Sequence, residues 1–266
     1  MKFVLEFDSL KVSLFENSRQ SVMDETSVKT PDVIEGQLNA GERGFITNAI
    51  LSAPKKPQVA LEVGTWLGGG STLHILRALE QNGSGHLYGI EADSCIYKRM
   101  IENIKKGAPE AANRFTPIFG YSNAAIPALF AKQPSDFKVD FVFLDGGNNP
   151  MEQITEFRLL DKHIPVGGQL LMHDARKRKG KFLVPHLKLL DNWETQLHDF
   201  SEMGLFYARK IKPSPSSGAL KAAGQSLRKL RLEPKEAVSA LLPSWICVII
   251  LKLLPRRMAR SLGEEK

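Results

Sequence analysis

From Val59 to Ile211, short apolar segments alternate with segments of helical spacing, and this alternation constrains the fold more than any other feature of the chain. Five segments have the composition of buried strands: VALEVG (59–64), HLYGIEA (86–92), RFTPIF (114–119), VDFVFLD (139–145) and GGQLLMHDA (167–175). A helix is expected after each, and TQLHDF (195–200) and GLFYARKI (204–211) are expected to pair as a hairpin. The alternation indicates a doubly wound α/β sheet of seven strands, mostly parallel, with an antiparallel edge hairpin.

A sheet of this kind binds ligands at the carboxyl ends of its strands, near the point where the strand order reverses. Functional residues are therefore expected just after Val63, Ile90, Phe119, Leu144 and Met172. Outside this core, a short strand is expected at residues 2–7 and a helix over AGERGFITNAIL, which begins at residue 40. Two prolines, at positions 127 and 185, are expected near the first turns of their helices.

A glycine-rich turn, Gly64-Thr65-Trp66-Leu67-Gly68-Gly69-Gly70-Ser71, follows the first strand. Glycines here let the backbone approach a ligand closely, and they open a helix whose N-terminal amides can face an anion. Glu91 ends the second strand 27 residues after Gly64, where an acid can accept hydrogen bonds from both hydroxyls of a ribose. Taken singly, the turn is also explained as a tight strand-to-helix connection, and Glu91 as a solvated carboxylate.

Gly120-Tyr121-Ser122 follows the third strand. There Tyr121 could pack on an adenine face and Ser122 could bond the adenine edge. The alternative is a turn in which Ser122 caps the next helix.

Two carboxylates are expected at neighbouring strand ends, Asp145 after the fourth strand and Asp174 after the fifth. Such a pair can share a divalent cation such as Mg²⁺ and leave positions for substrate hydroxyls. Alternatively, Asp145 bonds the amides of its own turn, and the neighbouring His173 is a satisfied core histidine. The charge run from Arg176 to Lys181 is expected to form a solvated loop, with attraction of an acidic substrate or membrane phosphates as the alternative.

These residues, in this order, resemble class I S-adenosylmethionine-dependent methyltransferases, closest to the catechol and macrolide-sugar types of O-methyltransferase. The likeness covers residues 35–211 and implies a Rossmann-like sheet. ALEVGTWLGGGST is similar to the family's first motif, with one extra residue in the turn. EGQLNAGERGFITNAI resembles the helix that helps to cover the cofactor. The implied cofactor-binding residues are Glu62, Gly64, Thr65, Trp66, Gly68, Gly69, Ser71, Glu91, Ala92, Gly120, Tyr121, Ser122 and Asp145.

The resemblance further implies a Mg²⁺ site at Asp145 and Asp174, and methyl transfer to a hydroxyl by in-line displacement. Asn148 stands where the family has a Lys or His base, and Ala175 stands where it often has an Asn metal ligand. An amide is no proton acceptor, so His173 is the alternative base, unless the acceptor is already nucleophilic. Cofactor binding is therefore the better supported half of the site.

Composition limits the class of partner. The net charge is +7, but the stretch from Pro213 onward holds ten Lys and Arg against four acids, which leaves the body nearly neutral. A nucleic-acid partner is not indicated. The two cysteines, Cys95 and Cys247, form no metal or disulfide pattern, which fits a cytoplasmic protein.

Three regions are expected: an N-terminal segment with a cap helix (1–57), the cofactor-binding domain (58–212), and a linker with a basic amphipathic tail (213–266). The N-terminal run carries acids unlike a signal peptide, and no stretch is long enough to span a bilayer. Residues 241–260 are apolar and then basic. They are expected to pack on the body or on a second subunit, or to lie on a membrane surface.

The function expected is O-methylation of a sugar or another small hydroxylated molecule. A nucleotide-dependent dehydrogenase would need a G-x-G-x-x-G turn, which Gly64-x-x-x-Gly68 fits poorly. A non-catalytic relative that binds cofactor or serves as a membrane-tethered interaction protein is the other alternative, and Asn148 and Ala175 favour it.

Overall fold

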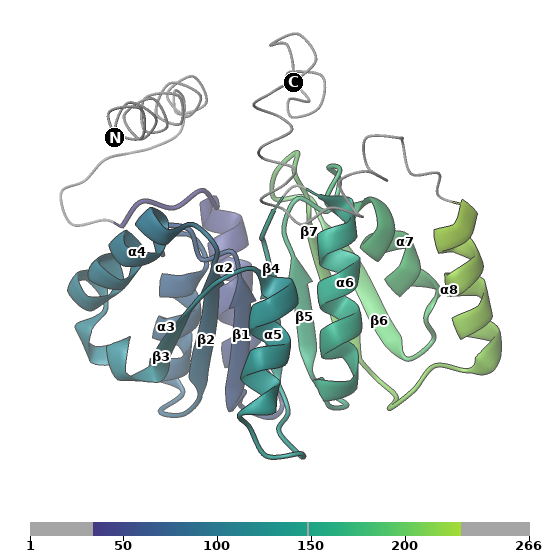
Figure 1. The fold of residues 1–266 in the computed structure, drawn as a ribbon, viewed down its shortest axis with the longest axis horizontal. Coiled ribbons are helices and arrows are strands. Elements are labelled where there is room, and N and C mark those ends of the chain that lie inside the picture. Colours follow the sequence, from purple (N-terminus) through teal and green to yellow (C-terminus); the bar gives the residue numbers. More distant parts are fainter. Residues whose placement is uncertain (1–33, 148, 230–266) are drawn as a thin grey trace, which may run out of the picture.

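The computed structural model describes residues 34–147 and 149–229. The short strand expected at residues 2–7, Asn148 and the tail segment 241–260 lie outside the described residues. The described chain forms a seven-stranded sheet in the order β3-β2-β1-β4-β5-β7-β6 (Figure 1). Its strands are β1 (Val59–Val63), β2 (His86–Glu91), β3 (Phe115–Phe119), β4 (Phe141–Leu144), β5 (Gln169–Met172), β6 (Trp193–His198) and β7 (Leu205–Lys210).

Strands β1 to β5 pair in parallel, whereas β7 pairs antiparallel with both β5 and β6. The doubly wound sheet with an antiparallel edge hairpin is therefore confirmed. The central strands β4 (FVFL) and β5 (QLLM) are buried at every residue, as expected of parallel strands that are covered on both faces. The edge strand β3 is less buried and contains Pro117, a residue that sheets tolerate at their edges.

Helices cover both faces of the sheet. One face packs against α2 (Ala40–Leu51), α3 (Thr72–Gln81) and α4 (Ser94–Gly107). The other packs against α5 (Ser122–Ala131), α6 (Pro150–Leu160) and α7 (Gly180–Leu189). Two short 3₁₀ turns, η1 (Pro109–Arg114) and η2 (Asp161–His163), complete the connections. The apolar core is therefore divided by the sheet into two layers.

A helix also follows the sheet, before the C-terminal tail. Helix α8 (Ser217–Lys229) lies against α7, and its Ala223 is fully buried in the core (Figure 1). The expected linker therefore leads, within the described residues, into a helix that packs on the body. The region boundaries at 57/58 and 212/213 stay predictions.

Two local expectations were wrong. Pro127 and Pro185 each lie at the sixth position of their helices, α5 and α7, rather than in the first turn. Each proline costs its helix one backbone hydrogen bond. Buried neighbours such as Ile126 and Leu187 hold the helices on the sheet despite that loss, because tertiary packing outweighs local propensity.

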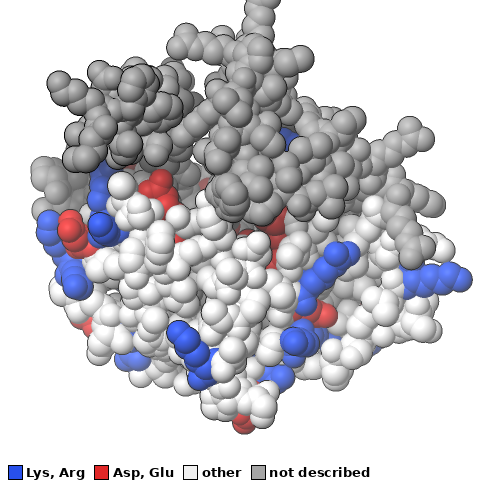
Figure 2. Space-filling view, viewed as in Figure 1, with Lys and Arg blue, Asp and Glu red and all other residues white. Residues whose placement is uncertain are grey.

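The charged side chains are dispersed over the visible face of the described chain (Figure 2). On the face shown in Figure 2, the Lys and Arg residues of the described chain are scattered among uncharged residues rather than gathered in a patch. Within the described ranges, no helix combines the length and the apolar content needed to cross a bilayer.

Candidate functional site

The backbone brings the predicted site residues to one edge of the sheet. Pairing continues for one residue beyond each strand: Gly64 N–H donates to Ile90 O (2.9 Å), Asp145 N–H to Val63 O (2.8 Å) and His173 N–H to Leu144 O (3.1 Å). At the next strand, Gly120 N–H donates to Glu91 O (2.9 Å). The predicted site residues therefore lie together just after the strand ends, and their functional roles stay predictions.

The glycine turn packs too tightly for side chains at two positions. Gly64 has φ +86°, and a Cβ there would lie 2.3 Å from the carbonyl oxygen of Asp145. A Cβ on Gly69 would lie 2.1 Å from Ile34 O, because the segment before α2 crosses over the turn and its Glu35 O accepts from Gly69 N–H (3.1 Å). These glycines let the turn pack against the end of β4 at one position and against the segment before α2 at the other.

Glu91 is hydrogen-bonded to the backbone of this turn. Its Oε2 accepts from Trp66 N–H (2.9 Å) and its Oε1 from Asp93 N–H (3.0 Å). Trp66 has φ +46°, an uncommon value for a residue with a side chain, and the bond to Glu91 holds it there. The backbone of Ala92 adds a third favourable contact to this carboxylate. A carboxylate offers about four lone-pair positions, so at least one remains for a ligand's hydroxyl.

Glu62 lies beneath the turn and is fully buried. It accepts a hydrogen bond from Ser71, while its Oε2 and the Thr65 hydroxyl make no hydrogen bond within the described residues. Burial raises the pKa of Glu62 to about 8, and the nearby charges of Asp145 and Glu91 add to that rise. Burial also raises the pKa of Glu91, against the lowering effect of its backbone bonds. Three acids therefore converge beside the glycine turn.

The segment after β3 offers an open apolar surface. Phe119 and Tyr121 are 55% and 47% exposed, and a Cβ on Gly120 would meet no atom within 4 Å. Ala92, after Glu91, is partly buried. Ser122 does not cap α5; it donates to Glu156 Oε1 of α6 (2.5 Å), so the capping interpretation is wrong. Burial raises the pKa of Glu156 to about 7 despite that hydrogen bond.

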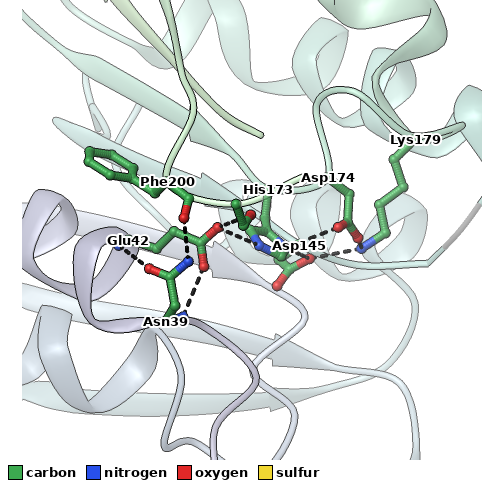
Figure 3. A network of polar contacts seen from close by, with 8 residues as sticks. Asn39, Glu42, Asp145, His173, Asp174, Lys179 and Phe200 are labelled. Carbon is green, nitrogen blue, oxygen red and sulfur yellow. Dashed lines mark hydrogen bonds and ion pairs between the residues drawn. The ribbon is translucent and has the colours of Figure 1, made fainter. Parts of the chain in front are cut away.

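A charged network links the ends of β4 and β5 to two other elements (Figure 3). Lys179 Nζ lies 2.8 Å from Asp145 Oδ1 and 2.8 Å from Asp174 Oδ2. His173 Nδ1 lies 3.4 Å from Oδ1 of each aspartate, and its Nε2 lies 3.3 Å from Glu42 Oε1 of α2. Three carboxylates and two cations therefore meet at this edge.

Glu42 is held by the ends of two elements. It forms a capping box with Asn39, and its Oε1 also accepts from Ser201 Oγ (2.6 Å) in the turn between β6 and β7. Asn39 in turn donates to Phe200 O (2.9 Å), as Figure 3 shows. The N-terminus of α2 is thereby fixed to the β6–β7 turn next to His173.

The contacts of the network favour the charged forms of His173, Lys179, Asp145 and Glu42. Burial disfavours the charged form of His173, but hydrogen bonds to Asp145 and Glu42 outweigh it and raise its pKa to about 10. Burial likewise opposes the charged form of Lys179, yet the charges of Asp145 and Asp174 raise its pKa. In Asp145 and Glu42 burial acts to raise the pKa, but the cationic and hydrogen-bonding partners lower it. A histidine that keeps its proton at neutral pH is poorly suited to the role of general base.

Residues 61–175 match the family model of a methyltransferase domain. The chain contains a methyltransferase domain. Its fold is that of class I S-adenosylmethionine-dependent methyltransferases, as the resemblance implied. No curated protein matches the chain.

Solved structures share the fold of this methyltransferase domain at low identity. The O-methyltransferase TomG from Streptomyces achromogenes, involved in tomaymycin synthesis and solved with S-adenosylmethionine, is 17% identical at a TM-score of 0.56, covering 68% of this chain and 83% of its own. An O-methyltransferase from Bacillus cereus in complex with S-adenosylhomocysteine is 16% identical (TM-score 0.54, 65% and 82%). An S-adenosylhomocysteine-bound methyltransferase from Podospora anserina is 13% identical (TM-score 0.54, 66% and 80%).

Two members of the charged network, Glu42 and Lys179, were not predicted from the sequence. Glu42 had a readable local signal, since Asn39-x-x-Glu42 has the spacing of a capping box, but nothing local connects it to His173. Lys179 was assigned to a solvated loop. It is 6% exposed, so for this residue of the charge run the expectation was wrong, whereas Arg176 and Lys177 are exposed.

The predicted metal ligands can be tested against the described residues. Asp145, His173 and Asp174 offer ligand atoms within 4.8 Å of one another. Mg²⁺ requires near-octahedral coordination, usually by oxygen atoms and water. Ala175 supplies no ligand, and the ammonium of Lys179 already lies between the two carboxylates. As they stand, these residues do not fit Mg²⁺.

Proposed function

We propose that this chain is a cytoplasmic S-adenosylmethionine-dependent O-methyltransferase with a small hydroxylated molecule as its acceptor. The observation that carries the proposal is the convergence of Glu62, Glu91 and Asp145 on the glycine turn. S-adenosylmethionine bears a sulfonium and an ammonium group, and both gain from nearby carboxylates. The cofactor supplies an electrophilic methyl group there.

The described residues fit this cofactor. The carboxylate of Glu91 suits the ribose hydroxyls, and the exposed ring of Tyr121 suits stacking with adenine. The unpartnered Glu62 Oε2 and Thr65 hydroxyl suit the polar groups of the methionine part. Gly64, Trp66, Gly68, Gly69, Ser71, Ala92, Gly120, Ser122 and Asp145 complete the proposed binding set.

The acceptor is proposed to lie on the side of β4 and β5. There the N-terminus of α2, the β6–β7 turn and the network of His173 border the ends of these strands. Phe200, 40% exposed, offers an apolar contact beside that network (Figure 3). The chain's task is to orient the acceptor oxygen toward the methyl group and to exclude water.

The affinity for S-adenosylhomocysteine tests the assignment of Glu91. Glu91→Ala removes the acceptor of both ribose hydroxyls and is expected to weaken binding about 30-fold, since hydrogen bonds to a charged group are among the stronger ones. Glu102→Ala, at an exposed acid of α4, is the matched control and should leave the affinity unchanged. Equal affinities for the two variants in calorimetric titrations would remove Glu91 from the site.

Methyl transfer itself is tested with radiolabelled S-adenosylmethionine and a panel of phenols, sugars and hydroxy acids. Label transferred to one of these acceptors supports the proposed function. Tight cofactor binding without transfer to any acceptor class would favour a non-catalytic relative.

A further inference from the structure

The two carboxylates that a metal would need are already bridged by a side chain of the protein. Lys179 Nζ is 2.8 Å from one oxygen of Asp145 and 2.8 Å from one oxygen of Asp174, and its side chain is 7% exposed. We propose that the Lys179 ammonium takes the place of a divalent metal in this site, so that the site works without one. The statement about the metal is independent of the proposed function, whereas the ammonium's role toward the acceptor rests on it.

The backbone around Lys179 is built to place this ammonium. Asp174 has φ +57°, and its carbonyl accepts from Lys177 N–H (2.9 Å), which folds the loop back toward the strand end. Gly180 packs so closely on Ala175 that a Cβ would lie 2.0 Å from the Ala175 oxygen. Lys179 therefore stands at the start of α7, directly opposite Asp174.

The loop is also fixed from outside. Ala175 N–H donates to Gly204 O (3.0 Å) and Arg176 N–H to Met203 O (2.9 Å), which ties the loop to the β6–β7 turn. The position of Lys179 thus follows from backbone contacts on both sides of it. By contrast, Lys177 of the same loop is exposed.

The charges around Asp145 and Asp174 disfavour the binding of a divalent metal ion there. Both ring nitrogens of His173 face carboxylate oxygens, so both are placed to donate and the ring is placed as a cation. With Lys179, two positive charges already face the three carboxylates of Glu42, Asp145 and Asp174. A divalent ion between the two aspartates would lie in contact with the ammonium of Lys179, and two positive charges in contact repel each other.

The ammonium can also perform the electrostatic task of the metal. It has three N–H donors, of which Asp145 and Asp174 take two. In the proposed role the third donates to the oxygen of the acceptor, where a positive charge favours the deprotonated hydroxyl. Lys179 would therefore hold and polarise the acceptor oxygen while the aspartates hold Lys179.

The test is a titration of Mn²⁺ into the full-length wild type and into Lys179→Ala, in which electron paramagnetic resonance measures the bound ion. Lys177→Ala, in the same loop, is the matched control. We expect no site-specific Mn²⁺ binding by the wild type or Lys177→Ala. Lys179→Ala should gain a Mn²⁺ site whose affinity is at least about tenfold above the detection limit that the wild type fails to reach, because the repelling charge is gone. The double variant Lys179→Ala, Asp174→Asn should lose that site.

Two outcomes would overturn the proposal. Wild type that binds Mn²⁺ as tightly as Lys179→Ala would show that the lysine gives way to a metal. If neither protein binds Mn²⁺, something other than Lys179 keeps metal out. Lys179→Gln, which can still hydrogen-bond the carboxylates, replaces Lys179→Ala should the latter melt at a much lower temperature. If the wild type does not bind S-adenosylhomocysteine, the proposed function is wrong, and the Mn²⁺ titration still tests the role of Lys179 independently.

Discussion

The two halves of the site differ in the sequence distance over which their residues make contact. In the cofactor half, Ser71 bonds Glu62 nine residues away and Trp66 bonds Glu91 25 residues away. In the acceptor half, Ser201 bonds Glu42 across 159 residues and Asn39 bonds Phe200 across 161. The bonds of Glu62 and Glu91 therefore form within one strand–helix–strand unit, to which the end of β4 is added at Gly64. The bonds of Glu42 and Asn39 to the β6–β7 turn need the finished fold.

The two halves are therefore sensitive to different changes. The cofactor half depends on backbone that passes closely at glycines, so an added methyl group should disrupt it. The acceptor half depends on charges that balance one another, so pH should disrupt it.

Gly64→Ala should be the most damaging change. The new Cβ would lie 2.3 Å from the Asp145 carbonyl oxygen at a φ of +86°, so both the turn and the end of β4 must move. We expect the free energy of unfolding to fall by about 2–4 kcal/mol and S-adenosylhomocysteine binding to be lost. Urea unfolding and calorimetry measure the two effects.

Gly83→Ala is the control for backbone strain alone, because Gly83 also has positive φ (+70°) but no atom lies within 4 Å of its added Cβ. It should cost about 1 kcal/mol and leave cofactor binding intact. Equal losses for the two variants would mean that the close approach at Gly64 is not what the turn depends on.

The acceptor half should lose stability in alkali through His173. Its pKa is raised from 6.5 to about 10, so its contribution to stability is fully present below pH 6.5 and is lost as pH rises through 10. The difference in free energy of unfolding between wild type and His173→Gln should therefore shrink over this window, by on the order of 3 kcal/mol.

His186→Gln is the matched control, since His186 is also buried but burial lowers its pKa. Its contribution is present above pH 6.5 and is lost only as pH falls, so its difference from wild type should stay flat between pH 6.5 and 10. A flat difference for His173→Gln as well would contradict the charged network.

Ser122→Ala should have the smallest effect. It removes the hydrogen bond to the buried Glu156 and should cost about 1 kcal/mol of unfolding free energy. Ser94→Ala, at an exposed serine of α4, should cost less. Urea unfolding compares the two, and a loss of cofactor affinity beyond about tenfold for Ser122→Ala would assign its hydroxyl chiefly to the adenine edge.

The sequence predicted the sheet, the hairpin and the strand ends because apolar runs and glycine or aspartate at their ends are local signals. For the same reason, it predicted that Glu91, Asp145 and Asp174 lie at strand ends. Lys179 escaped prediction because its burial depends on how the loop after β5 folds back at Asp174 and Gly180, and every residue of the run Arg176 to Lys179 is basic. The contact of Glu42 with His173 escaped because it forms only when α2 docks against the β6–β7 turn.

The most direct measurement is calorimetric titration of S-adenosylhomocysteine into the full-length protein, first with a chelator and then with saturating Mg²⁺. We expect micromolar binding in the chelator and the same isotherm with Mg²⁺, because the cofactor half is built from carboxylates and backbone and the neighbouring cation is Lys179. Binding that appears only with Mg²⁺ would contradict the role given to Lys179. No binding in either condition would contradict the cofactor site itself.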